Sequence, residues 1–304
     1  GMDKKGQIDS LSKIIKPDVG VITNISYAHI KNFKNIKQIA LAKSEIMNNI
    51  KNDGAVVLNA DDQFYSLHKK IAMKKNIKVY SFSFKKKKSD IKLNYIKKEG
   101  KKYKIFILNS NQKLYFYSSS NFESYVKNIL ATLAVIAIFK DINKLDKNIF
   151  YNFKLPTGRG DISQIKINKK KIFLIDESYN SNPLSLKSAI KNFDMMKVKN
   201  SKKHLILGDM LDLGKYSKKL HFKISNSINK TSINYVNVIG KHITETYKNI
   251  DINKKGIILK KKSQIIDLIK NNINNNDYLM IKGSNSTGLH RLTDNLKTGK
   301  TNAL

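Results

Sequence analysis

The 304-residue sequence contains no cysteine, which excludes a disulfide framework, a cysteine-based zinc site and a thiol nucleophile. It has no apolar run of eighteen or more residues, so no membrane span is predicted. Its first ten residues, GMDKKGQIDS, lack the apolar core of a signal peptide. With 40% hydrophobic and 9% aromatic residues, the chain can bury cores for two domains of ordinary size. We therefore expect a cytoplasmic protein.

Arginine is also scarce, because Arg159 and Arg291 are the only arginines in a chain whose formal net charge is +35. The other basic residues are lysines spread along the whole chain, and abundant Lys, Asn and Ile together are typical of a bias towards AT-rich codons. Recognition of bases and phosphates usually draws on the planar guanidinium. We therefore expect solvated lysines that help to attract anionic substrates, and no specific nucleic-acid partner.

The first half of the chain contains sequence patterns of both helices and strands. Apolar spacing predicts helices over 8–16 and 36–50 and a strongly apolar, buried helix over 124–140. Runs rich in β-branched residues predict strands at 19–25, 54–62 and 77–84. Between 85 and 120, alternating apolar and polar residues predict antiparallel strands around turns at 99–100 and 109–111.

The segment LPTGRGD (155–161) contains one proline and two glycines, which is typical of a hinge, and it divides the chain into domains 1–154 and 155–304. After it, strand and helix patterns alternate from KKIFLIDE (170–177) to DYLMIKGS (277–284). Strands that alternate with helices imply a parallel sheet with right-handed crossovers. The predicted fold class is therefore α/β.

Several of the predicted strands end in polar groups. These endings are VITNISYAH (21–29), VVLNADD (56–62), LIDESYN (174–180), LILGDM (205–210) and MIKGSNS (280–286). Ligands of open α/β sheets bind outside the carboxyl ends of the strands. Backbone N–H groups and helix N-termini can meet phosphate there, and carboxylates can meet ribose hydroxyls or Mg²⁺. We therefore expect a nucleotide site at these strand ends.

A series of longer motifs follows one order along the chain. They are GMDKKGQI (1–8), PDVGVITNISYAHIKNF (17–33), ALAKSEIM (40–47), VVLNADD, VKNILATLAV (126–135), LPTGRGD, LIDESYNSNPLSLKSAI (174–190), LILGDMLDLGKYSKKLH (205–221) and MIKGSNS. In this order they resemble the Mur ligase family over almost the whole chain. The segments 179–183 and 208–214 resemble the members of that family that join D-alanyl-D-alanine to UDP-N-acetylmuramoyl-tripeptide.

The resemblance implies a fold, a reaction and its cofactors. The fold would be the C-terminal part of a P-loop-type Mur ligase central domain, followed by a Rossmann-like C-terminal domain. The reaction would form an amide bond in peptidoglycan synthesis: ATP phosphorylates the carboxylate of UDP-MurNAc-tripeptide, and the amine of D-Ala-D-Ala attacks the acyl phosphate. ATP and Mg²⁺ would be the cofactors, and UDP-MurNAc-tripeptide and D-Ala-D-Ala would be the substrates. The protein would be a cytoplasmic monomer.

The chain also departs from the family pattern. The Gly-rich P-loop G-T-x-G-K-T does not occur in these 304 residues, nor does the family's Mg²⁺-binding glutamate, which precedes the position of Gly1. Gln7 replaces a glutamate, Tyr125 stands where an asparagine is usual, and Asn285 replaces the arginine of K-G-S-R. We therefore interpret the chain as a fragment that is inactive alone.

Three residues occupy the family's catalytic positions. The resemblance implies that His29 ligates Mg²⁺ through a neutral imidazole nitrogen. It implies that Lys43 carries a carbamate, which turns a cation into an anion able to bind Mg²⁺. It also implies that Arg159 reaches the γ-phosphate when the domains close. Without the resemblance, a structural histidine and two surface cations would be the simpler interpretation.

A larger set is predicted to bind the nucleotide or the amine substrate. Asp176 or Glu177 would accept both ribose hydroxyls, although either could instead serve the turn before the helix that follows Pro183. Asn128, on an apolar helix, would be unsatisfied unless adenine meets its amide. The remaining positions are Asn59 and Asp61, beside adenine or in a turn; Tyr179, Asn180 and Asn182, in the loop after 178; Asp209 and Lys282, on the C-terminal side of the cleft; and His221, which fits a helix surface equally well.

Two other functions fit the sequence less well. A sister amide ligase, such as a folylpolyglutamate or cyanophycin synthetase, is one, but the Tyr-Asn-x-Asn-Pro loop at 179–183 argues against it. The other is a non-enzymatic module that keeps the C-terminal domain as a nucleotide-binding remnant and holds nucleotide without turnover.

Overall fold

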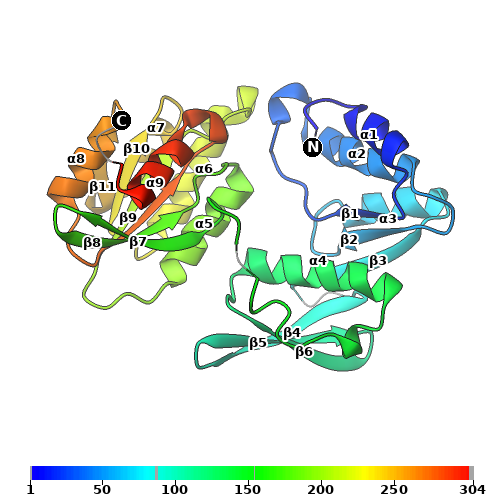
Figure 1. Cartoon of the computed structure of the whole chain (residues 1–304). Coiled ribbons are helices and arrows are strands. Elements are labelled where there is room, and N and C mark those ends of the chain that lie inside the picture. Colours follow the sequence, from blue (N-terminus) through cyan, green and yellow to red (C-terminus); the bar gives the residue numbers. More distant parts are fainter. Residues whose placement is uncertain (1, 86–87, 154, 301–304) are drawn as a thin grey trace. The chain divides into compact units, whose positions relative to one another are not determined.

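The computed structural model describes residues 2–85, 88–153 and 155–300. The chain divides into two compact units, Gly1–Lys154 and Leu155–Leu304, and each is built on its own six-stranded sheet (Figure 1). In the described ranges, no helix is both long enough and apolar enough to cross a lipid bilayer.

The first unit alternates helices and strands and then forms a three-stranded meander before its longest helix. Its elements are α1 (Gln7–Ile15), β1 (Val19–Ile22), α2 (Ile36–Ser44), β2 (Ala55–Asn59), α3 (Tyr65–Lys74), β3 (Lys78–Ser83), β4 (Ile91–Glu99), β5 (Lys102–Asn109), β6 (Gln112–Ser118) and α4 (Glu123–Phe139). Short 3₁₀ turns, Ile30–Asn32, Glu45–Asn48 and Ile142–Lys144, link some of them.

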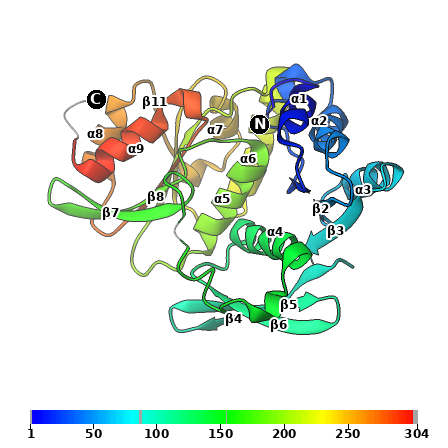
Figure 2. The ribbon, with the colours of Figure 1, turned by 45° about the vertical axis from the view of Figure 1, so that its right-hand side comes forward.

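The sheet of the first unit has the order β1-β2-β3-β4-β5-β6. Pairing is parallel from β1 to β4 and antiparallel from β4 to β6. Helix α4 places one apolar side on the meander, where Leu130 and Leu133 join Ile105, Ile107 and Phe116 in one buried cluster. Figure 1 and Figure 2 both show α4 on one side of β4–β6.

Helix α1 packs with its polar side inward. Asn49 donates to the Asp9 carboxylate and to the Ser12 hydroxyl, which joins α1 to the turn after α2. The apolar side chains of Ile14 and Ile15 are 81% and 70% exposed. The apolar spacing that predicts this helix therefore marks its solvent side, whereas apolar spacing normally marks the side that faces the core.

The second unit begins with two consecutive strands and then alternates helices and strands. Its elements are β7 (Asp161–Ile167), β8 (Lys170–Asp176), α5 (Pro183–Met195), β9 (Lys203–Gly208), α6 (Ser217–Asn229), β10 (Tyr235–Ile239), α7 (Thr244–Lys248), β11 (Lys255–Leu259), α8 (Ser263–Asn272), β12 (Tyr278–Lys282) and α9 (Leu289–Thr298). Short 3₁₀ turns lie at Gly214–Tyr216, Ile252–Lys254 and Asn285–Thr287.

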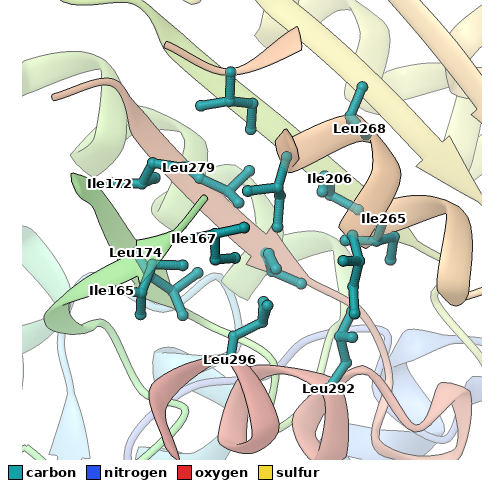
Figure 3. Packing of buried hydrophobic residues seen from close by; sticks show 14 of the residues in the cluster. Ile165, Ile167, Ile172, Leu174, Ile206, Ile265, Leu268, Leu279, Leu292 and Leu296 are labelled. Carbon is teal, nitrogen blue, oxygen red and sulfur yellow. The ribbon is translucent and has the colours of Figure 1, made fainter. Parts of the chain in front are cut away.

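The sheet of the second unit has the order β11-β10-β9-β12-β8-β7 and is parallel except for β7. Each parallel crossover is bridged by a helix, as the alternating sequence predicts. Figure 3 shows Leu292 and Leu296 of α9 packed with Ile165 of β7 and Leu279 of β12 in the apolar core. This core covers one face of the sheet and holds β7 and α9 in place.

Two lysines donate to backbone carbonyls at helix ends in the second unit. Lys203 Nζ donates to the Asp194 carbonyl near the end of α5 at 2.5 Å, and Lys170 Nζ donates to the Lys270 and Ile273 carbonyls at the end of α8. The last carbonyls of a helix lack partners within it, and the helix dipole favours a cation there. Neither helix ends in a glycine with left-handed backbone conformation, which is the usual C-terminal cap, and these lysines stabilise the ends instead.

Candidate functional site

The loop after β1, residues 23–29, receives three contacts from two neighbouring segments, the end of β2 and helix α2. Asn59 Nδ2 donates to the Thr23 carbonyl at 2.8 Å, and Lys43 Nζ donates to the Asn24 carbonyl at 3.1 Å. The Ile25 N–H donates to Asp62 Oδ2 at 2.8 Å. The carboxyl ends of parallel strands meet at one edge of a sheet, so residues from β1, β2 and α2 converge on the loop that leads to His29.

Lys43 is a half-buried lysine in the last turn of α2. Burial lowers the pKa of Lys43, and the nearby Asp62 carboxylate offsets only part of that effect. A lysine with a lowered pKa has a larger fraction of neutral amine at neutral pH. The neutral amine is the form that can add to a carbonyl carbon or to CO₂.

His29 lies at the far end of the same loop in a left-handed conformation, with φ at 61°. Its Nδ1 atom lies 2.9 Å from Asp3 Oδ1. Backbone conformations of this kind are uncommon outside glycine and gather at functional sites. The structure therefore places His29 beside a carboxylate from the first residues of the chain.

Glu45 fixes the segment that carries Asp3. Both of its carboxylate oxygens accept the Gly6 N–H at 2.9 Å, and Oε2 also accepts the Asp9 N–H at 3.3 Å. These N–H groups form the first turn of α1, which has no side-chain cap of its own. A carboxylate is favourable there because the helix dipole is positive at that end. Glu45 follows Lys43 closely, so it ties the end of α2 to the start of α1.

The side chains of this unit do not form a complete Mg²⁺ site. In the described ranges, no three His, Asp, Glu or Cys side chains are grouped so that they could hold a metal ion. His29 and Asp3 are suitable donors, whereas Lys43 as an ammonium cannot ligate a cation. A carbamate on Lys43 would add oxygen donors, and further ligands would still be needed.

Asn59 and Asp61 are bound into the strand ends. Asn59 accepts the Asp61 N–H at 2.9 Å, in addition to its bond to Thr23. Asp61 accepts from Ser83 Oγ at 2.7 Å and from the Phe84 N–H at 2.7 Å. Both residues therefore have a structural role, because their hydrogen bonds join the ends of β1, β2 and β3. Their position beside adenine stays a prediction.

Asn128 lies on the exposed side of α4. The reasoning that its amide would be buried and unsatisfied is therefore wrong, because water reaches it. Helix α4 is apolar nearly all round, so periodicity alone could not tell which side faces the sheet.

Asp176 is fully committed to the fold of the second unit. Its Oδ1 atom accepts from the Ser178 N–H at 3.0 Å and from Ser178 Oγ at 2.5 Å, and Oδ2 accepts from Lys297 Nζ at 2.5 Å. Burial alone would raise the pKa of Asp176, but the hydrogen bonds from Lys297 and Ser178 outweigh it and lower that pKa. Lys297 also reaches Asp161 at 2.6 Å and so ties α9 to β7 and β8.

Glu177, the next carboxylate, faces a buried lysine. Lys282 Nζ lies 3.1 Å from Glu177 Oε2 and donates to the Asn180 carbonyl at 2.9 Å. Burial lowers the pKa of Lys282, and the Glu177 carboxylate opposes that effect. The pair joins the end of β8 to the end of β12 and leaves Glu177 more exposed than Asp176.

Arg159 and Tyr179 form an exposed stack beside this pair. The Arg159 guanidinium carbon lies 4.2 Å from the centre of the Tyr179 ring, and that ring is 48% exposed. Gly158, with φ at 76°, makes the close approach possible, because a Cβ there would lie 3.0 Å from Tyr179. Asn285 Nδ2 donates to the Tyr179 carbonyl at 3.2 Å. The stack presents a guanidinium to solvent at the strand ends, where an anion could bind it.

Asn182 is the N-cap of α5. Its Oδ1 atom accepts from the Ser185 N–H at 3.0 Å, and the Ser185 hydroxyl accepts the Asn182 N–H in return. With Pro183 in the first turn, this is a capping box. Asn180 accepts the Ser181 N–H at 2.8 Å and holds the loop before the cap.

Asp209 and His221 are more buried than the sequence suggests. Asp209 accepts the N–H groups of His242 and Ile243, which fixes the turn before α7. His221 is fully buried, so its interpretation as a helix-surface residue is wrong. Its Nδ1 atom donates to the Ser217 carbonyl, its Nε2 atom accepts the Met210 N–H, and burial lowers its pKa.

Three residues of the network were not singled out from the sequence. Asp62 received no prediction, although it directly follows Asp61, and Lys297 is one lysine among many. Thr293 lies 2.9 Å from Ser178 through their hydroxyls. The leucine spacing at 289, 292 and 296 would have predicted α9 and so the side of it that carries Thr293 and Lys297.

Two family models match the chain: the Mur ligase middle domain over residues 1–136, and the Mur ligase, glutamate ligase domain over residues 163–285. The UDP-N-acetylmuramoyl-tripeptide–D-alanyl-D-alanine ligase of Buchnera aphidicola is 32% identical over 307 residues, a match that covers 97% of this chain and 63% of that protein. The chain thus spans less than two thirds of that relative's length.

Solved structures agree in fold. MurF from Acinetobacter baumannii aligns with a TM-score of 0.83 at 22% identity, over 98% of this chain and 63% of that one. The MurF ligase of Thermotoga maritima, solved in complex with ADP, aligns with a TM-score of 0.81 at 20% identity, over 97% of this chain and 65% of that one. The chain therefore belongs to the Mur ligase family and carries its middle and C-terminal domains.

Proposed function

We propose that this chain supplies the middle and C-terminal domains of an ATP-dependent ligase that adds D-Ala-D-Ala to UDP-MurNAc-tripeptide in peptidoglycan synthesis. The observation that carries the proposal is the match to a ligase of that name along 97% of the chain. The geometry of the candidate site also supports the proposal, because Arg159 stacks on Tyr179 in the loop 179–183.

The proposed reaction has two steps. A carboxylate oxygen of the tripeptide attacks the γ-phosphorus of ATP, and ADP leaves. The amine of D-Ala-D-Ala then attacks the acyl carbon, phosphate leaves, and the nitrogen loses a proton. Negative charge gathers on the phosphoryl group and on the acyl oxygen, so the protein must supply cations and hydrogen-bond donors.

We assign Arg159 to the transferring phosphoryl group. The exposed position of the Arg159 guanidinium and its stacking on Tyr179 support this role, because the ring orients the guanidinium without occupying its N–H groups. We assign the ribose contact to Glu177. Both oxygens of Asp176 already accept hydrogen bonds from the chain, and this favours Glu177 over its neighbour.

We assign Mg²⁺ binding to His29 and to a carbamate on Lys43. The lowered pKa of Lys43 supports the modification, since the neutral amine is the form that adds to CO₂. Mg²⁺ would supply positive charge at the phosphates. The remaining ligands would come from parts of the ligase beyond these residues. The enzyme would work in the cytoplasm, where ATP and the UDP-linked substrate are present.

The test uses the complete reading frame that encodes this chain. ADP release is measured with ATP, Mg²⁺, UDP-MurNAc-tripeptide and D-Ala-D-Ala, and then with each component left out. Release that needs all four, with the dipeptide joined to the tripeptide by mass spectrometry, is expected. Turnover with glutamate in place of D-Ala-D-Ala would favour a sister ligase, and ATP binding without turnover would favour the nucleotide-binding remnant. Either of these results would contradict the proposal.

Two arginines allow a matched control. Arg159→Lys keeps the charge but loses the planar fork, and we expect a loss of kcat of about 100-fold or more. Arg291→Lys makes the same change on the exposed side of α9 and should leave kcat unchanged. Equal effects of the two substitutions would rule out the assigned role of Arg159. The 304-residue chain alone is expected to release no ADP.

A further inference from the structure

The meander β4–β6 has one side that no described helix of the first unit covers. Figure 1 and Figure 2 show α4 on the other side, where Ile105, Ile107 and Phe116 are buried. Alternation along each strand and the pairing between strands place eleven side chains on the uncovered side, which we call the outer face. They are Lys92, Tyr95, Lys97, Glu99, Lys102, Lys104, Phe106, Leu108, Lys113, Tyr115 and Tyr117.

A β-bulge in β4 builds this face. Leu93 pairs with Ile107 and Tyr95 pairs with Phe106, so Asn94 is an extra residue in the strand. Simple alternation would direct Tyr95 inward and Ile96 outward, because side chains in a strand change sides at every residue. The bulge reverses both positions, which puts Ile96 against the core and Tyr95, at 48% exposure, on the outer face.

The aromatic residues of the outer face form a row across the three strands. The rings of Tyr95 and Phe106 stack with centres 4.2 Å apart and planes 17° from parallel. Phe106 lies 5.9 Å from Tyr115, which meets Tyr117 edge to face at 5.7 Å. Tyr95 and Phe106 therefore cover one face of each other's ring, and the Lys104 ammonium lies over the Tyr115 ring, so stacking and cation contacts already occupy several ring faces of the row.

Lysines flank this aromatic row on both sides. The outer face has five lysines and one acidic residue, Glu99, which already pairs with Lys97 at 3.8 Å. Lys104 Nζ lies 4.0 Å from the centre of the Tyr115 ring. The result is a flat, cationic surface with a central band of amphipathic rings.

We propose that the outer face binds the surface of an anionic lipid bilayer. Lysines near such a surface gain electrostatic attraction, and tyrosine rings favour the boundary between headgroups and acyl chains, because one end is apolar and the other wet. A single-stranded nucleic acid would fit less well, since bases need free ring faces on which to stack. This inference concerns residues other than those assigned to the nucleotide site and does not depend on the proposed reaction.

A fluorescence reporter can test where the protein touches a bilayer. The chain contains no tryptophan, so Tyr95→Trp puts a single reporter on the outer face. Phe222→Trp, on the exposed side of α6, is the matched control at 42% exposure. With vesicles of equal parts phosphatidylglycerol and phosphatidylcholine, we expect a blue shift from Tyr95→Trp and none from Phe222→Trp. A shift from both variants, or from neither, would overturn the proposal.

A pair of charge-reversal variants separates this face from the general charge of the chain. Lys97, Lys104 and Lys113 are changed to Glu together, and the control changes the exposed lysines Lys69, Lys70 and Lys74 of α3 in the same way. Each lysine at an anionic surface strengthens binding roughly fivefold, so the first variant should lose about 100-fold in vesicle co-sedimentation. The control should lose far less.

The remaining outcomes are also decisive. Equal losses from the two triple variants would mean that net charge alone drives binding and would overturn the proposal. Binding of oligothymidylate in the absence of vesicle binding would assign the face to nucleic acid instead. If the circular dichroism of the first triple variant shows that it does not fold, the Tyr95→Trp and Phe222→Trp comparison decides alone, because neither substitution removes a buried group.

Discussion

The two units hold their charged residues in different ways. In the second unit, Lys282 faces Glu177, and Lys297 joins Asp161 to the buried Asp176, so these two lysines have carboxylate partners, whereas the buried Lys203 donates to a backbone carbonyl at the end of α5. In the first unit, the half-buried Lys43 donates to the neutral carbonyl of Asn24. Lys282 and Lys297 are held in ion pairs of the fold, whereas the Lys43 amine, which donates to a carbonyl in the loop that leads to His29, remains open to chemistry. The comparison suggests a division between scaffold and reaction.

The largest expected effect tests whether the units unfold separately. Leu130→Ala in the first core and Leu279→Ala in the second each remove a fully buried side chain. Each should lower the free energy of unfolding of its own unit by about 2–5 kcal/mol, through lost burial and a cavity. Urea unfolding followed by pulsed hydrogen exchange should assign each loss to one unit. A loss shared by both units would mean that they unfold as one.

The next effect tests the closed network of the second unit. Lys297→Met would leave the buried Asp176 carboxylate without its cation and should cost about 3 kcal/mol. Lys51→Met breaks a similar pair with Asp18, but both partners are exposed, so stability should change little. If the two substitutions have equal effects on urea midpoints, the burial of the network does not matter.

Acid should weaken the second unit more than the first. Burial lowers the pKa of His204 and His221 in the second unit and of His68 in the first. A unit that contains a histidine with a lowered pKa in the folded state becomes less stable as pH falls below about 6.5, because the unfolded chain then takes up the proton first. Asp176 adds a further loss below about pH 4. Urea midpoints of each unit at pH 7 and pH 5 measure the difference, and a first unit that weakens more would contradict it.

Competitive labelling compares the half-buried Lys43 with the buried Lys282 directly. Burial lowers the pKa of both Lys43 and Lys282, but Lys282 is only 2% exposed and faces Glu177. With limiting acetic anhydride near neutral pH, Lys43 should react faster than an exposed lysine such as Lys37, and Lys282 should stay unmodified. Peptide mass spectrometry gives the three rates. A Lys43 rate below that of Lys37 would argue against an available neutral amine.

The smallest effect concerns the exposed apolar side of α1. Ile14→Lys with Ile15→Lys places charge where both side chains already face solvent. The free energy of unfolding should change by less than about 0.5 kcal/mol, as for other surface positions. A large loss would show that these side chains are buried in solution. Differential scanning calorimetry at two protein concentrations would detect it and any self-association that buries them.

Sequence patterns predicted most strands because β-branched runs have few alternatives. They missed α3 and β7 for physical reasons, and they missed α9 although its leucine spacing does predict a helix. Lysines interrupt the apolar spacing of α3, so its stabilisation comes from packing on β2 and β3 that no local pattern records. β7 starts inside the segment predicted as a hinge and pairs antiparallel, against the expectation of an all-parallel sheet.

The sequence predicted which residue types lie at the candidate site, but it could not predict which of them are already held by hydrogen bonds within the fold. The polar strand endings at 59–62 and at 174–180 each lie at the carboxyl end of a parallel strand of their own sheet, as the alternating pattern predicts. The sequence could not show that Asp176 is bound by Ser178 and Lys297, because Lys297 lies in a helix far along the chain. Nor could it show which side of α4 carries Asn128, since that depends on how the helix packs.

The lysines at the helix ends set a limit on redesign. In a version of this chain with fewer positive charges, we expect that an exposed lysine can be exchanged for glutamine with little loss of stability. Lys170 and Lys203 belong to a different class, because Lys170 donates to two backbone carbonyls at the end of α8 and Lys203 donates to one near the end of α5. Chemical methylation of every amine would also modify the ammonium groups of Lys170 and Lys203. A charge-reduced variant should therefore be made by substitutions that retain these two lysines.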